Sequence, residues 1–394
     1  MAKQQDGYLS AKESRRISKE NRRITDQYEK QRKRKNVPES EYLTQMKNPE
    51  NAVEFDNLHT YFFTDTDVVK SVDGVSFEVP VGKTVGVVGE SGCGKSVTSL
   101  SLMQLLQRPQ GQIVQGEIRL NLGNGKAYDV AKTPGTVMQH LRGNYISMIF
   151  QEPMTSLNPV FRIGAQIDEV IALHDGEGKS KEDIKKRTVE MLEMVGIANS
   201  QGVYEMYPHE LSGGMRQRVM IAMALACNPK VIIADEPTTA LDVTIQAQIL
   251  RILKKLAEES DTSVILITHD MGVVAEMADH VMVMYAGNTV EYADTKTLYK
   301  EPLHPYTWGL LDSMPKLSSS AKEDLKTIPG TPPDLRLTGY CCNFYNRCPY
   351  ATEICRQQVP PLKEVAPGHF VACHRQDGEH RLTRGEVNVT CKKM

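Results

Sequence analysis

The sequence predicts an α/β protein in which helices flank a parallel or mixed β-sheet. Between residues 51 and 300, short β-rich runs alternate with helix-compatible stretches, as in sheets built through crossover helices. The clearest strands are Thr84–Val88, 231–234 and 263–268. Residues 89–230 separate the first of these from the second, which is far more than one crossover helix needs. We therefore expect an inserted subdomain, at about 152–228, that includes the helical stretch Lys181–Met194.

Composition places the chain among ordinary globular proteins. Its 394 residues allow two or three domains, with 40% hydrophobic and 24% charged residues. The formal net charge of −2 gives no reason to expect nucleic acid as the main partner. No apolar run approaches the roughly 18–20 residues that cross a bilayer, and no signal peptide is recognisable. We expect a cytosolic chain, so that any membrane path would come from other chains.

Residues 1–50 are polar and strongly charged, with basic doublets at 15–16 and 22–23 and a basic run at 32–35. Apolar positions are too sparse to bury a core, which predicts a disordered or loosely helical tail. A solvated tail is one interpretation. The other is contact with anionic lipid headgroups, which attract clusters of lysine and arginine.

Residues 301–394 differ in amino-acid composition from the rest of the chain. Prolines recur from Pro302 onward, and five of the eight cysteines fall between positions 341 and 373. This composition predicts a small irregular module held by something other than a large hydrophobic core. In a cytosolic protein such a cysteine cluster indicates metal ligation more than disulfides.

The strongest local signal is the glycine-rich run GESGCGKS at residues 89–96. It follows a predicted strand and precedes the helix-compatible segment 97–106, which is the context of a P-loop and argues against a chance turn. Lys95 is expected to reach the β- and γ-phosphates of a nucleotide, and the Ser96 hydroxyl to ligate Mg²⁺. Backbone groups of the loop would cradle the phosphates. The nucleotide-contacting residues predicted in this segment are Gly89, Ser91, Gly92, Gly94, Lys95, Ser96 and Val97.

A second signal is the acidic pair Asp235-Glu236 at the end of the apolar strand 231–234. Neighbouring side chains on a strand point to opposite faces, so the two carboxylates can act differently. Asp235 is expected to hold Mg²⁺, and Glu236 to orient and deprotonate the attacking water. Taken alone, such a pair is more often a helix cap or a solvated edge, but the P-loop favours the catalytic interpretation.

A third signal, Ser212-Gly213-Gly214, precedes a helical run at 215–226 and forms a second phosphate-binding helix N-terminus. One nucleotide needs only one P-loop. A second cradle makes sense if it serves a nucleotide held by another subunit.

Together these motifs resemble the ATPases of ATP-binding-cassette (ABC) transporters. The resemblance implies a P-loop NTPase core with a RecA-like subdomain, an antiparallel β subdomain and a helical insert, paired head to tail so that two ATPs are sandwiched. It also implies a role for five further residues. Gln151 would sense Mg²⁺, Asp242 would lie in the loop that communicates across the dimer, His269 would touch the γ-phosphate, and Phe62, or else Tyr61, would stack on adenine.

Within that family the chain is similar to the ATPases of oligopeptide and dipeptide importers and to their nickel-importing relatives. The residues that carry the similarity lie at 151–159, 166–167, 241–248 and 304–307, and those at 160–164 and 329–333 point to the D-type subunit. The resemblance implies peripheral attachment at the cytoplasmic face of the membrane. It also implies an F-type ATPase partner, two membrane permease subunits and, indirectly, an extracytoplasmic peptide-binding protein. Nickel or another small solute is the alternative cargo.

The segment that follows Gln151 would link the ATP site to the helical insert and so move a surface that grips the membrane subunits. Ordinary packing of residues 152–169 is the alternative. A soluble cassette ATPase acting on DNA or ribosomes is disfavoured, because the chain has one P-loop and no sustained heptads. A non-catalytic subunit would be expected to lack Glu236 or His269, and both are present.

Four cysteines have the spacing C-x5-C-x6-C-x17-C, which the resemblance associates with a [4Fe–4S] cluster. They are Cys342, Cys348, Cys355 and Cys373, and Cys341 could replace the first. Four thiolates suit iron–sulfur or zinc. The tight C-x2-C hairpin typical of structural zinc is absent, which favours the cluster, and free structural thiols are the third possibility.

Overall fold

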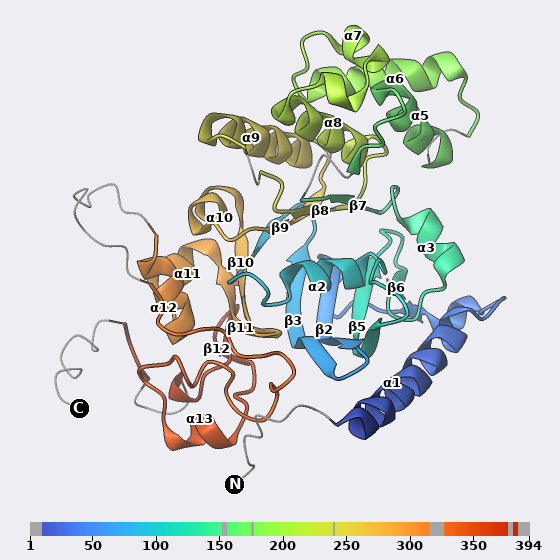
Figure 1. The fold of residues 1–394 in the computed structure, drawn as a ribbon. Coiled ribbons are helices and arrows are strands. Elements are labelled where there is room, and N and C mark those ends of the chain that lie inside the picture. The colour runs from blue at the N-terminus through green and yellow to red at the C-terminus, as the bar shows by residue number, and fades with distance from the viewer. Residues whose placement is uncertain are drawn as a thin grey trace.

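The computed structural model describes residues 10–151, 156–174, 177–238, 241–314, 327–376 and 381–384. Over these ranges the chain forms an eight-stranded sheet, a five-stranded sheet and a layer of helices (Figure 1). Predicted features at 1–9, 152–155, 240 and 391 lie outside the described residues. Within the described ranges, no helix combines the length and the apolarity that a bilayer span requires.

The eight-stranded sheet has the order β12-β13-β11-β10-β4-β9-β8-β7. Its five strands from β10 to β7 pair in parallel, and the three others pair antiparallel at one edge. The strands are β4 (Thr84–Val88), β7 (Ile146–Ile149), β8 (Val231–Asp235), β9 (Ser263–Ile267), β10 (His280–Tyr285), β11 (Asn288–Asp294), β12 (Lys363–Ala366) and β13 (His369–Val371). The central strands are buried throughout, which explains their continuous apolar sequence.

The five-stranded antiparallel sheet has the order β1-β6-β5-β2-β3. Its strands are β1 (Leu43–Thr44), β2 (Asn51–Phe63), β3 (Val68–Pro80), β5 (Gly111–Asn121) and β6 (Ala127–Asp129), and α3 (Gly135–Leu141) follows. Helix α2 (Lys95–Leu102) lies between the two sheets, where its Ser101 hydroxyl is 2.9 Å from that of Thr60 on β2. The helix predicted at 97–106 ends earlier, because Gln104 adopts a left-handed φ of 49°.

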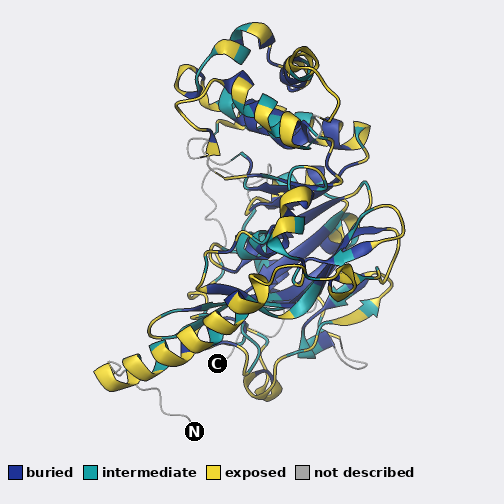
Figure 2. Ribbon diagram, turned by 90° about the vertical axis from the view of Figure 1, so that its right-hand side faces the viewer, coloured by how far each residue is buried: buried dark blue, intermediate teal, exposed yellow. Residues whose placement is uncertain are grey.

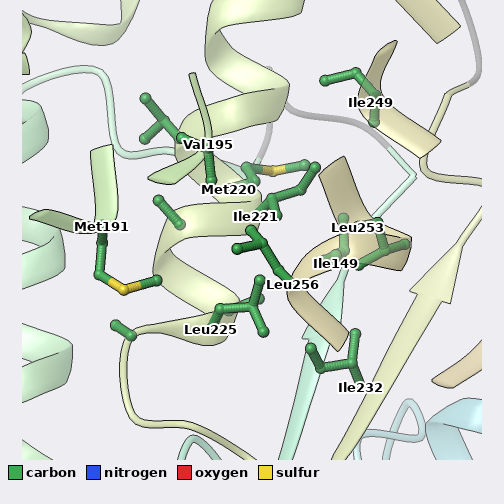
Figure 3. Close-up of a cluster of buried hydrophobic side chains, with 14 of the residues drawn as sticks. Ile149, Met191, Val195, Met220, Ile221, Leu225, Ile232, Ile249, Leu253 and Leu256 are labelled. Atoms are coloured by element: carbon green, nitrogen blue, oxygen red, sulfur yellow. The ribbon is translucent and has the colours of Figure 1, made fainter. Parts of the chain in front are cut away.

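The predicted insert between β7 and β8 consists of helices in a layer of their own (Figure 1). They are α5 (Ile163–His174), α6 (Lys181–Met194), α7 (Ser200–Glu205), the 3₁₀ turn η2 (Pro208–Glu210) and α8 (Gly213–Leu225), and α9 (Val243–Glu259) packs beside them. Figure 3 shows Met220 and Leu225 of the insert meeting Ile149 of β7, Ile232 of β8 and Leu256 of α9. This shared apolar core fastens the insert to the sheet.

Residues 11–32, predicted to be disordered or loosely helical, are helical, but the helix is docked on the rest of the protein and not loose. They form one helix, α1 (Ala11–Arg32), which begins with a capping box between Ser10 and Glu13. Figure 2 shows its exposed outer face. The inner face docks through polar groups: the Asn21 amide donates to the Thr64 carbonyl at 2.7 Å, and buried Glu29 accepts from Gln112 at 3.2 Å. The 3₁₀ turn η1 (Glu39–Glu41) follows.

The C-terminal module is less separate than the sequence predicts. Helices α10 (Met271–Met277) and α11 (Thr295–Lys300) precede the module, whose first helix is α12 (Pro305–Asp312). The module then adds β12 and β13 to the edge of the large sheet. It also contains α13 (Glu353–Gln357) and the 3₁₀ turn η3 (His374–Gln376). Its buried Phe344 belongs to one apolar cluster with Val88 of β4, Tyr285 and Tyr306. The module therefore shares a hydrophobic core with the strand that leads into the P-loop.

Candidate active site

A cavity of about 500 Å³ opens at the carboxyl ends of β4, β8, β9 and β7. The predicted catalytic residues Lys95, Gln151, Glu236 and His269 all line it, together with Ser71, Ser91, Gly92, Gly94, Ser96 and Val97. Residues that are far apart in the sequence thus meet around one space.

The P-loop turns so tightly that glycine is required at two of its positions. Gly94 has a φ of 107°, and a Cβ there would lie 2.2 Å from the Ser71 carbonyl oxygen. At Gly89 a Cβ would lie 2.2 Å from the Met284 carbonyl oxygen. Both clashes are with backbone, so no side chain could move to relieve them. The loop is packed against β3 and β10 in the shape that a phosphate cradle needs.

Lys95 is buried in the base of this loop, with 6% of its surface exposed. Its ammonium donates to the carbonyl oxygens of Gly89, at 2.8 Å, and Glu90, at 3.1 Å. These bonds hold the positive charge beside the cavity. Phosphate oxygens are stronger acceptors than neutral carbonyls, so the ammonium can exchange partners when a triphosphate enters.

Ser96 and Asp235 meet at the predicted Mg²⁺ position. The Ser96 hydroxyl donates to Asp235 Oδ1 at 3.1 Å. Asp235 is 6% exposed, and burial raises the pKa of its carboxyl. A divalent cation would oppose this by favouring the ionised form, so a hydroxyl and a buried carboxylate side by side fit an oxygen-ligated Mg²⁺.

Glu236 extends toward the other side of the strand end. Gln151 Nε2 donates to its Oε2 at 2.9 Å, and His269 Nδ1 lies 3.5 Å from its Oε1. The residue adopts a left-handed φ of 45°, which is strained for glutamate, while its N–H donates to the Ile267 carbonyl at 2.9 Å. Strain held by neighbouring structure is common where a side chain must be aimed precisely.

The predicted second phosphate cradle, Ser212–Gly214, does not line this cavity. Ser212 caps α8, its hydroxyl accepting from the Met215 N–H at 3.4 Å, and both Ser212 and Gly213 are exposed. In Figure 1, α8 belongs to the helical layer, away from α2. Gly214 lies instead beside Ile245 of α9, and the Ile245 N–H donates to Asp242, which caps that helix.

Neither aromatic residue proposed for adenine stacking lines the cavity. Phe62 lies near Gly111 at the start of β5. The Tyr61 hydroxyl, on the opposite face of β2, donates to Asp73 at 2.5 Å. Adenine contact by Phe62 or Tyr61 therefore remains a prediction. Ser71 lines the cavity but belongs to no motif that the sequence shows. It can be recognised only from the fold, in which β3 lies beside the P-loop.

The cysteine module groups the four predicted ligands. Burial, with a smaller contribution from the neighbouring Cys355, raises the pKa of Cys342 and Cys373 to about 12 and that of Cys348 to about 11. The described residues nevertheless contain no group of three or more His, Cys, Asp or Glu side chains that could hold a metal ion.

These features define a class of protein. A buried P-loop lysine, a hydroxyl–carboxylate pair suited to Mg²⁺ and a second carboxylate flanked by glutamine and histidine make up the site of a P-loop nucleotide triphosphatase.

Family comparisons make the assignment specific. Residues 72–239 match the ABC transporter family, and 290–355 match the C-terminal region of oligopeptide/dipeptide transporters. The chain belongs to the ABC transporter family, within its oligopeptide/dipeptide branch, and is an ATPase.

Individual relatives agree with this assignment. The chain is 52% identical to the oligopeptide transport ATP-binding protein OppD of Bacillus subtilis, over 81% of this chain and 87% of that one. It is 47% identical to OppD of Salmonella typhimurium, over 85% and 97%. Among solved structures, the dimeric post-hydrolysis state of the ATP-binding cassette MJ0796 with ADP and Pi superimposes with a TM-score of 0.54 at 26% identity, over 62% of this chain and 98% of that one.

The position of Glu236 predicts the behaviour of Glu236→Gln. The amide keeps the shape of the side chain but cannot accept a proton from water, so ATP should still bind while turnover falls at least about a hundredfold. Steady-state hydrolysis and ATP binding measured on the same preparation test this. Glu259→Gln, which removes an exposed carboxylate paired with Lys255, is the matched control. Undiminished turnover in Glu236→Gln would remove Glu236 from the mechanism.

Proposed function

We propose that the chain is the D-type, ATP-hydrolysing subunit of an importer that takes up oligopeptides or dipeptides. The observation that carries the proposal is the meeting of the four predicted catalytic side chains, Lys95, Gln151, Glu236 and His269, around one cavity in a chain that also has the C-terminal region of this transporter branch. The related OppD proteins, named for oligopeptide transport, support the cargo class.

In the proposed mechanism Lys95 binds the β- and γ-phosphates, while Ser96 and Asp235 would hold Mg²⁺, which would supply positive charge against the phosphates. Glu236 accepts a proton from the attacking water, which it positions together with Gln151 and His269. The hydrogen bond from Gln151 to Glu236 supports this arrangement. Because hydrolysis changes charge beside Gln151, its effect can pass directly to the segment that leads into the helical insert.

We further propose that the site is completed by a second ATPase subunit, of the F type, in a head-to-tail dimer. Ser212, Gly213 and Gly214 would contact the nucleotide held by that partner, and Asp242 would lie at the dimer face. Their exposure outside the chain's own cavity supports this assignment. Val243, next to Asp242, is 82% exposed, as expected of an apolar residue that a partner covers.

A second surface fits the membrane permease subunits. A groove of about 390 Å³ runs between the core and the helical insert, lined by residues that include Leu105, Phe150, Leu157, Val170 and Met220. Leu105 and Phe150 are each 40% exposed. An apolar groove next to Gln151 could transmit closure of the ATP site to two permease subunits. We propose peripheral attachment at the cytoplasmic face, with an extracytoplasmic peptide-binding protein acting indirectly.

We propose the same division of the chain as the sequence predicts. Residues 51–300 form the ATPase domain, with the helical subdomain at about 152–228, and 301–394 form the C-terminal module. Nickel or another small solute is the alternative cargo within this branch. This subunit would not meet the cargo itself, so cargo must be tested in cells.

The cargo is tested by deleting the gene and supplying peptides as the sole source of amino acids. We expect growth to fail on peptides and to persist on free amino acids, with nickel uptake unchanged. A wild-type copy and the Glu259→Gln control should restore growth, whereas Glu236→Gln should not. Loss of nickel uptake with peptide use intact would replace the peptide assignment with nickel import.

For the cysteine module we propose a [4Fe–4S] cluster on Cys342, Cys348, Cys355 and Cys373. Support comes from the grouping of these four thiols. Each iron of such a cluster takes one thiolate, so its ligands stand further apart than those of a single zinc ion. Zinc and a metal-free module with protonated thiols are the alternatives.

Protein purified without oxygen should accordingly be brown and contain about four irons per chain. Cys348→Ser should lose this iron, and Cys341→Ser, which changes the neighbouring spare thiol, should keep it. Colourless protein with stoichiometric zinc, or with neither metal, would contradict the cluster.

A further inference from the structure

The C-terminal module contacts the P-loop through one buried arginine. Arg347 precedes Cys348 in the chain and directs its guanidinium at Glu90, the second residue of the P-loop. Its Nη1 donates to Glu90 Oε2 at 2.6 Å, and its Nη2 donates to Oε1 at 2.9 Å. The arginine side chain is 4% exposed and the glutamate side chain 28%. This is a two-pronged, charge-assisted contact at the edge of the ATP site.

The module and its surroundings fix the guanidinium on every side. Nε donates to the Pro329 carbonyl at 2.9 Å, and Nη2 donates also to the Ile328 carbonyl at 3.2 Å. Nη1 donates in addition to the Tyr285 hydroxyl at 3.3 Å. All five N–H donors of an arginine are thus used. Lysine carries a positive charge but lacks this planar fork, so it could not reproduce the set.

Glu90 is in turn bonded to the rest of the site. Its N–H donates to the hydroxyl of Tyr306, a fully buried residue on α12, at 2.8 Å. Its carbonyl accepts from the ammonium of Lys95 at 3.1 Å. One residue therefore connects Arg347, Tyr306 and the catalytic lysine.

The charge of Glu90 makes the arginine necessary. A carboxylate in a loop that binds a triphosphate would repel the ligand unless a positive charge were held against it. Arg347, which lies 257 residues further along the chain, supplies that charge. Its two-pronged contact also limits rotation of the Glu90 side chain. A cost to ATP binding should follow when Arg347 is removed while Glu90 keeps its charge.

We propose that Arg347 is a positioning residue of the ATP site and that the C-terminal module is a working part of that site. Arg347 keeps the P-loop backbone at Glu90 in its phosphate-binding shape and cancels the Glu90 charge. This inference rests on the proposed ATPase function. Because Cys348 directly follows Arg347, loss of order in the cysteine module would also displace Arg347 and so change the affinity for ATP.

The test compares full-length wild type with Arg347→Gln, Glu90→Gln and the double variant. Dissociation constants are measured with a non-hydrolysable Mg-ATP analogue, and KM and kcat with ATP. We expect Arg347→Gln to weaken binding about tenfold, the effect of one lost charge contact of modest strength. KM should rise with it, while kcat at saturating ATP changes less than about twofold. Glu90→Gln removes both the repulsion and the contact, so the double variant should bind no more weakly than Arg347→Gln.

Two further variants separate positioning from simple support of the fold. Arg347→Lys should recover part of the affinity, because it restores charge without the fork. Arg384→Gln breaks another arginine–carboxylate pair of the same region, with Asp312, and should leave affinity unchanged. If Arg347→Gln does not fold, the affinities of Arg347→Lys and Glu90→Gln carry the test.

Wild-type affinity in Arg347→Gln, or additive losses in the double variant, would overturn the inference. The inference would also be overturned if the fraction of binding lost equalled the fraction of unfolded protein measured by thermal denaturation. In each case wild-type hydrolysis would leave the proposed function intact. Failure of the wild-type chain and its partner to hydrolyse ATP would instead overturn the proposed function.

Discussion

The active site depends on the register of four neighbouring parallel strands. Val87 of β4 and Asp235 of β8 both pair with Ile267 of β9, and Ala234 of β8 pairs with Ile149 of β7. All four strands therefore end at one edge, where the P-loop, the acidic pair, His269 and Gln151 follow. The pleat then sends Asp235 toward Ser96 and Glu236 toward Gln151. A slip of one residue in β8 would turn Asp235 and Glu236 each to the opposite face and remove both from the positions proposed for metal binding and proton transfer.

Much of this arrangement is predictable from sequence because its strands and motifs each consist of consecutive residues. The central strands are buried on both faces, so they are visible as unbroken apolar runs, and the predicted Thr84–Val88 and Lys181–Met194 match β4 and α6. The P-loop and the acidic pair are short motifs with a direct chemical interpretation. The roles of Gln151, Asp242 and His269, by contrast, follow only from the family resemblance, since a lone glutamine or histidine has no distinctive pattern.

Other features escape prediction because their partners lie far away or their contacts are polar. Helix α1 docks with Asn21, Thr25 and Glu29, spaced four residues apart on one face, so that its buried positions are polar and do not form the apolar stripe that usually marks a docked helix. The contact between Glu90 and Arg347 joins positions separated by 257 residues. Each of these requires the tertiary fold before it can be recognised. The same contacts join helix α1 and the described part of the C-terminal module to the body of the protein.

We propose that the two predicted phosphate-binding turns of this chain serve two different nucleotides. A structure of the assembled transporter, with Glu236→Gln in this subunit and Mg-ATP bound, is the sharpest test. Lys95 should contact one triphosphate, while Ser212 and Gly214 should contact the triphosphate held by the second ATPase subunit. A structure in which Ser212 lies remote from every bound nucleotide would contradict it.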